Sequence, residues 1–140
     1  MSPTILVPHD GSSHAQGALE YALETFPRAR IVLFHAIDPF DVADETEFSP
    51  LTEQWLDDRR EDTAELFDEA LADLEVGDTT VETETAVGSP GQTIVAAVDD
   101  VDADQIVVGT RGRGNVAKAR MGSTAELVVR RADVPVTVVR

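Results

Sequence analysis

A group of glycines near residue 110 has the spacing and setting of a phosphate-binding site. Gly109 ends an apolar run, Gly112 follows it, and Gly122 with Ser123 opens a helical pattern. Glycine lets backbone N–H groups approach a ligand closely, and the start of a helix has N–H donors at the positive end of its dipole. The pattern Gly109-x2-Gly112-x9-Gly122-Ser123 therefore predicts phosphate binding.

Two better-known phosphate motifs do not fit this chain. The sequence contains no Gly-Lys-Ser or Gly-Lys-Thr, which the P-loop requires. The dinucleotide fingerprint belongs after the first strand of its fold, whereas these glycines come after the fourth predicted strand. No pair of nucleophile and base emerges from the sequence, so we predict no catalytic residue.

The distribution of charge supports an anion site in the same stretch. The chain has 27 acidic and 11 basic side chains, of which one, Lys118, is a lysine. Residues 1–108 hold 25 acidic and 4 basic side chains, whereas residues 109–140 hold 2 and 7. An acidic surface with so little lysine suggests a halophilic source, and its long-range field would repel nucleic acid.

The elements that must position these glycines alternate along the chain. Short runs rich in Ile and Val are separated by helical patterns, which is typical of βαβ units and a parallel sheet in one domain of residues 1–140. We predict strands at Thr4–Pro8, Arg30–Ile37, Thr79–Val87, Gln105–Gly109 and Val134–Val139. Residues 38–50 show neither period and are predicted to be an exposed loop.

Helix ends are predicted from local signals. Ser13 with Gln16, and Ser89 with Gln92, have the form of capping boxes. A long helix with Trp55 at its start is expected to stop at Gly77. The last helix is predicted over residues 122–132, with one apolar face turned inward. That face comprises Ala125, Val128, Val129 and Ala132.

The whole chain resembles the universal stress protein family in motifs and in their order. Besides the glycine pattern, the matching segments are Ile5–Ser12, Leu33–Ala36, Gly88–Pro90 and Val134–Val139. The resemblance implies a Rossmann-like α/β fold of the adenine nucleotide alpha hydrolase type. In that fold five parallel strands lie in the order 3-2-1-4-5 with helices on both faces. It also implies ATP as the ligand and leaves open whether Mg²⁺ accompanies it.

Carried over to this sequence, the resemblance implies nine contact residues. Asp10 and the backbone at Pro8 would meet the adenosine, and Ala36 would meet the adenine edge through its backbone. The phosphate end would be formed by the remaining six, which are Gly109, Arg111, Gly112, Gly122, Ser123 and Thr124. This chain has Arg111 where the family often has histidine, and Asn115–Arg120 where it is aliphatic, so its phosphate end is more cationic.

Several of these residues also have a purely structural interpretation. Asp10 could only hold the strand-to-helix corner, and Ser123 and Thr124 could only cap a helix. Arg111 and its neighbour Arg113 could simply balance the acidic surface. His35 is interpreted as a core histidine, and His9 has no partner that the sequence reveals.

ATP binding is the first of three interpretations of the function. In it, the chain is a cytoplasmic stress-response module in which ATP orders the Gly112–Gly122 loop and alters a surface that other proteins recognise. The alternatives are a nucleotide phosphohydrolase or transferase that uses Asp10 to hold a metal, and a structural dimer with a vestigial loop. With no leader and no membrane span expected, a soluble protein is predicted. The final strand, Val134–Val139, is expected at a sheet edge that pairs in a homodimer.

Overall fold

The computed structural model describes residues 2–40, 49–110 and 121–140. Strands and helices alternate along this part of the chain. In chain order they are β1 (Thr4–Pro8), α1 (Ser13–Thr25), β2 (Arg30–Ile37), α2 (Glu53–Leu71), β3 (Thr80–Val87), α3 (Pro90–Asp100), β4 (Gln105–Gly109), α4 (Ser123–Arg131) and β5 (Val136–Val139). Three predicted strands match residue for residue, while β3 begins one residue later and β5 two residues later than expected.

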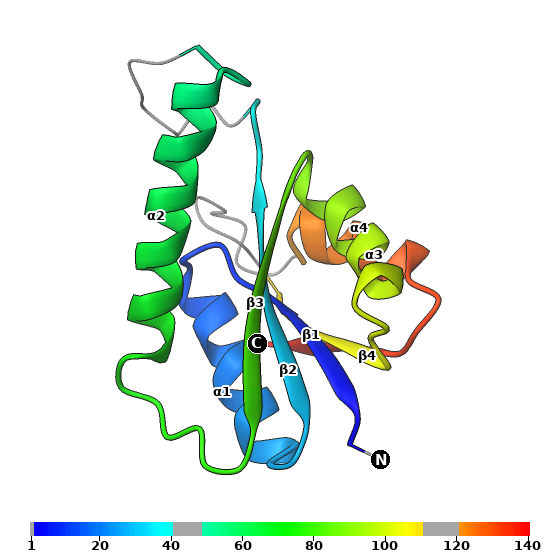
Figure 1. Cartoon of the computed structure of the whole chain (residues 1–140). Helices are drawn as coiled ribbons and strands as arrows, with labels where there is room; N and C mark the ends of the chain where they lie inside the picture. The colour runs from blue at the N-terminus through cyan, green and yellow to red at the C-terminus, as the bar shows by residue number, and fades with distance from the viewer. Residues whose placement is uncertain (1, 41–48, 111–120) are drawn as a thin grey trace.

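The strands form one parallel sheet in the order β3-β2-β1-β4-β5, which confirms the predicted fold class. Figure 1 shows α1 and α2 on one face of this sheet and α3 and α4 on the other. The carboxyl ends of all five strands therefore point to the same edge, where α/β sheets bind ligands.

Burial on both faces explains why the central strands are almost wholly apolar. Leu6 of β1 and Val32 of β2 pack toward α3 and α4, whereas Ile5 and Ile31 pack toward α1 and α2, and all four are fully buried. β3 is instead largely exposed, and polar residues such as Glu82 and Glu84 alternate along it with other side chains. It is an edge strand, as its alternation predicted.

The predicted capping boxes were wrong in their details. The N-cap of α1 is Ser12, whose Oγ accepts from the Ala15 N–H at 3.1 Å, and Ser13 is the first helical residue. Serine is a favoured N-cap residue at either position, and the backbone geometry selects Ser12, which has Ala15 and not Gln16 three residues on. Ser89 is the N-cap of α3, but its Oγ lies 3.2 Å from Gln92 Oε1 and caps no backbone N–H.

Two other helix predictions need correction, and the predicted loop of residues 38–50 lies partly outside the described residues. α2 ends at Leu71, because Gly77, with φ of +59°, belongs to the turn that leads into β3. Val129 was expected to face inward on α4 but is 43% exposed, since it is rotated about 100° around the helix from the buried Val128. Of the predicted loop, residues 41–48 are not described.

Candidate functional site

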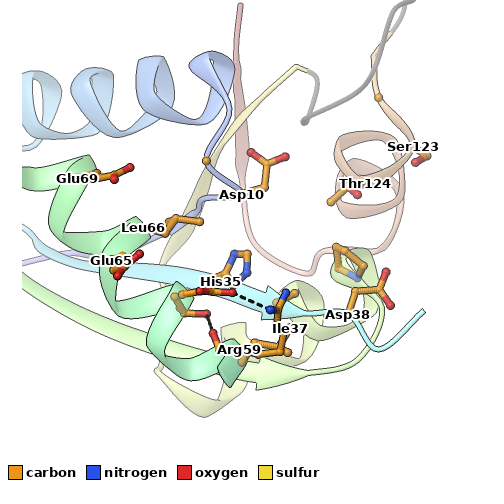
Figure 2. A pocket seen from close by; sticks show the side chains of 16 residues that line it. Asp10, His35, Ile37, Asp38, Arg59, Glu65, Leu66, Glu69, Ser123 and Thr124 are labelled. Carbon is orange, nitrogen blue, oxygen red and sulfur yellow. Dashed lines mark hydrogen bonds and ion pairs between the residues drawn. The ribbon is translucent and has the colours of Figure 1, made fainter. Parts of the chain in front are cut away.

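A cavity of about 570 Å³ lies at the carboxyl ends of β1 and β2. Its walls come from the β1–α1 turn, the end of β2, one side of α2 and the first turn of α4. Figure 2 shows residues of α2 and residues of α4 on opposite sides of this space, with Asp10 between them. Segments that are far apart in the sequence thus line one cavity.

The structure brings together seven of the nine predicted contact residues. Five line the large cavity, namely Asp10, Ala36, Gly122, Ser123 and Thr124. Pro8 and Gly109 line a smaller cavity of about 100 Å³ that shares Asp10, Ala36 and Thr124 with the first. Arg111 and Gly112 lie outside the described residues.

Asp10 both shapes the turn and faces the cavity. Its Oδ1 accepts a hydrogen bond from the Ser12 N–H at 3.0 Å, and Gly11 beside it has φ of +88°, which favours glycine. The interpretation of Asp10 as a residue that holds the strand-to-helix corner is therefore confirmed. The same turn places this carboxylate on the wall of the cavity.

His9, for which the sequence revealed no partner, is buried and fully engaged. Its Nδ1 accepts from the Gly11 N–H at 3.0 Å, and its Nε2 lies 2.8 Å from Gln16 Oε1. Gln16 in turn donates through Nε2 to the Ala70 carbonyl at 2.9 Å, so that α1 and α2 are tied to the turn. Burial lowers the pKa of His9 below its ordinary value and outweighs the hydrogen bond that His9 makes to Gln16 and the charge of Asp10.

The α2 wall is the part of the site that sequence reasoning missed. Arg59, Asp62, Glu65 and Glu69 all line the cavity from this helix. The Arg59 guanidinium is held by two carboxylates, with Nη2 at 2.5 Å from Asp58 and 2.8 Å from Asp62. Asp62, Glu65 and Glu69 share one helical face by spacing, but nothing in the sequence indicates that this face borders a cavity.

The described walls are mainly acidic. Five carboxylates face the cavity together with a single guanidinium, that of Arg59, among the residues that the structure describes. The five are Asp10, Asp38, Asp62, Glu65 and Glu69. A ligand with an anionic group would be repelled from the α2 side, so that group belongs on the opposite side, at the start of α4.

The start of α4 is suited to an anion. Gly122 is its N-cap, so the interpretation of Ser123 and Thr124 as caps is wrong. The Gly122 N–H already donates to the Thr110 carbonyl at 2.6 Å. The amides of Ser123 and Thr124 follow in the first turn, where helix geometry provides no intrahelical acceptor.

Gly109 has a packing reason of its own. A Cβ at this position would lie 2.6 Å from the backbone C and O of His14, closer than real Cβ atoms approach. Glycine therefore lets the end of β4 pass directly beside the start of α1. Its place on the small cavity and its packing role coexist.

Residues 2–40, 49–110 and 121–140 contain no cluster of three or more His, Cys, Asp or Glu side chains arranged to hold a metal. Among the helices described, none has the length and hydropathy to span a membrane.

Comparisons with known proteins agree with this architecture. The model of the universal stress protein family matches residues 1–140. A universal stress protein of Thermus aquaticus is 36% identical, and the match covers 100% of both chains. The solved structure of a Methanocaldococcus jannaschii universal stress protein superposes with a TM-score of 0.82 at 28% identity and covers 99% of this chain and 96% of its own. A universal stress protein solved in complex with cAMP gives a TM-score of 0.65 at 26% identity, with 99% and 97% covered.

Proposed function

This chain belongs to the universal stress protein family, and from that premise we propose that it is an adenine-nucleotide-binding regulatory protein with ATP as its first candidate ligand. The observation that carries the proposal is the cavity that gathers Asp10, Ala36 and the start of α4 at one edge of the sheet. Its volume of about 570 Å³ falls within the usual range of small-molecule sites, roughly 300–1,000 Å³. The relative solved with cAMP supports an adenine nucleotide as the ligand class.

The proposed orientation follows from the charges on the walls. The adenosine would lie against Pro8, Asp10 and Ala36, near the ends of β1 and β2. The phosphates would lie at Ser123 and Thr124, where the α4 dipole favours negative charge. Arg111 and Gly112, which precede α4 in the sequence, are proposed to complete the phosphate end.

Mg²⁺ is proposed to enter with the phosphates and not through a protein cage. The acidic α2 wall raises the electrostatic cost of a free triphosphate, and a divalent cation bound to the phosphates would lower it. Asp10 is the described carboxylate that lines both cavities on the strand side of the site. It is our candidate for an indirect contact with that cation.

The proposed role is a stress-response module in the cytoplasm, in which nucleotide occupancy is the signal that partner proteins read. We further propose a homodimer through β5, which pairs with β4 on one side and lies at the end of the strand order. The unpaired side of such a strand is a natural pairing edge. The acidic, lysine-poor composition fits a halophilic source.

Mass spectrometry of the nucleotide released from purified, denatured protein is the direct test. We expect an adenine nucleotide, and micromolar to millimolar binding of ATP by calorimetry in Mg²⁺ and molar salt. The absence of released nucleotide, combined with no heat of binding for ATP, ADP, AMP or cAMP up to millimolar concentration, would overturn the proposal. Sustained multiple turnover of ATP would replace it with an enzymatic function.

A further inference from the structure

His35 has its hydrogen-bonding roles assigned by the backbone beside it. Its Nδ1 lies 2.8 Å from the carbonyl oxygen of His9. A carbonyl only accepts, so Nδ1 must carry the hydrogen of this bond. In the neutral ring, Nε2 is then an acceptor.

The carbonyl that fixes His35 is itself held rigidly. The His9 N–H donates to the Phe34 carbonyl at 2.7 Å, and the His9 ring is engaged at both nitrogens, by Gly11 and Gln16. Because the Gly11 N–H must donate to His9 Nδ1, the hydrogen of the neutral His9 ring is on Nε2. His9 therefore has little freedom to turn its carbonyl away from His35.

His35 is half-buried and lines both the large and the small cavity. Figure 2 shows its ring extending from β2 toward Asp10, into the space between α2 and α4. The carboxylates that line this side of the large cavity, such as Asp10 and Asp38, are also acceptors when ionised. A ligand atom placed here meets acceptors and needs to be a donor.

We infer that His35 is a specificity-determining residue, whose Nε2 accepts a hydrogen bond from a neutral N–H or O–H donor of the bound ligand. The inference rests on the proposed nucleotide-binding function and specifies which kind of ligand group the site would recognise. Two nucleotide groups have this chemistry, the exocyclic amino group of adenine and a ribose hydroxyl. A carbonyl at the same place would leave two acceptors facing each other without a hydrogen.

The test uses His35→Asn in the full chain. The Asn side-chain amide can occupy the place of Nδ1 and keep donating to the His9 carbonyl, but it has no atom at the place of Nε2. His14→Asn is the matched control, because His14 is also half-buried and is absent from both cavity linings. Thermal melting of each variant establishes that it is folded.

Binding is measured with AMP and four analogues: IMP, purine riboside monophosphate, 2′-deoxy-AMP and 3′-deoxy-AMP. The first pair removes the amino donor and the second pair removes one hydroxyl each. We expect the parent to prefer AMP over the analogue lacking the relevant donor by about three- to tenfold, as one hydrogen bond would give. That preference should fall below about twofold in His35→Asn and persist in His14→Asn.

Failure of this inference is distinguishable from failure of the proposed function. Unchanged preferences for all four analogues in a folded His35→Asn protein that still binds AMP would overturn the inference alone. No nucleotide binding by the parent would overturn both. Independently of any ligand, long-range ¹H–¹⁵N spectra should show the Nδ1–H form of neutral His35, and an Nε2–H form would overturn the inference.

Discussion

The backbone N–H of Gly122 donates to the carbonyl of Thr110 at 2.6 Å, which joins the chain just after β4 to the start of α4. The Thr110 N–H in turn donates to the Val139 carbonyl at 2.9 Å, so that β5 is tied to the same point. This pair of bonds fixes where α4 begins relative to the cavity. It makes Gly122 the natural place to test the phosphate assignment.

Gly122→Val should abolish ATP binding without unfolding the protein. Gly122 is buried, but its φ of −66° and ψ of 160° are allowed for any residue, so valine adds no backbone strain. We expect the variant to fold. The branched side chain would fill space that a phosphate needs, and we expect affinity to fall at least about tenfold. Gly122→Ser is the control, because serine is small and a favoured N-cap. Equal ATP affinities of a folded valine variant and the parent would rule out this phosphate site.

Gly109→Ala should destabilise the protein through packing. The new Cβ would lie 2.6 Å from backbone atoms of His14, which cannot rotate away as a side chain can. We expect a loss of about 1–3 kcal/mol in the free energy of unfolding, measured with urea. Gly17→Ala is the opposite case, because a Cβ there meets nothing within 4 Å in the middle of α1, and it should stabilise by about 0.5–1 kcal/mol. An unchanged free energy of unfolding in Gly109→Ala would contradict this prediction and show that β4 and α1 can separate at little cost.

His9 should make stability fall as the pH drops below about 6.5. Its folded pKa is lowered from 6.5 by burial, so the unfolded chain takes up a proton first, and the free energy of unfolding decreases between 6.5 and the lowered pKa. His9→Asn keeps an acceptor for the Gly11 N–H but does not titrate. Urea unfolding at pH 7.5 and 5.0 in molar salt should therefore show a larger loss for the parent than for His9→Asn. Equal losses would contradict this prediction.

Glu82, whose pKa is also shifted, does not affect that comparison at the pH values chosen. The hydrogen bond from Arg30 lowers the pKa of Glu82 from 4.5, so the stability linked to this exposed pair is lost only as the pH falls below 4.5. Measurements at pH 5.0 and above do not reach that range. The difference between parent and His9→Asn then reports His9.

Salt should stabilise the protein up to molar concentration. The chain carries a net charge of −16, and the Debye length shrinks from about 10 Å at 0.1 M to about 3 Å at 1 M salt. Screening would weaken the repulsion among carboxylates, including those on the α2 wall. We expect the apparent melting temperature in KCl to rise between 0.1 and 2 M. A flat or falling curve would contradict the halophilic interpretation.

β5 should mediate a homodimer that tightens with salt. Val138 of β5 is half-buried, and Val138→Lys would place a charge at this edge while its aliphatic stem can still cover the core. We expect the parent to be a dimer and this variant a monomer by light scattering in molar salt. Val81→Lys, the same change on the opposite edge strand β3, should leave the dimer intact. A monomeric parent in molar salt would refute the proposed interface.

The sequence by itself determined where the five strands lie, to within two residues at their starts, because strand positions depend on local pattern. Their order was predicted from the family resemblance and is confirmed. Apolar runs such as Ile5–Val7 are readable since both faces of a central strand are buried. Parallel strands also end at one edge, which is why Asp10 and Thr124 line the same cavity as expected.

Only the tertiary structure decided which groups complete the site. The choice of Ser12 over Ser13 as cap depends on backbone angles. The His9 ring is held by Gly11 and Gln16, and Gln16 is positioned in turn by the carbonyl of the distant Ala70. The acidic α2 wall depends on which side of the helix faces the cavity, a packing outcome that a helical pattern does not encode. His35 was interpreted as a core histidine for the same reason. Whether a half-buried ring faces protein or cavity is determined by the carbonyl that holds it, and a sequence does not show where that carbonyl points.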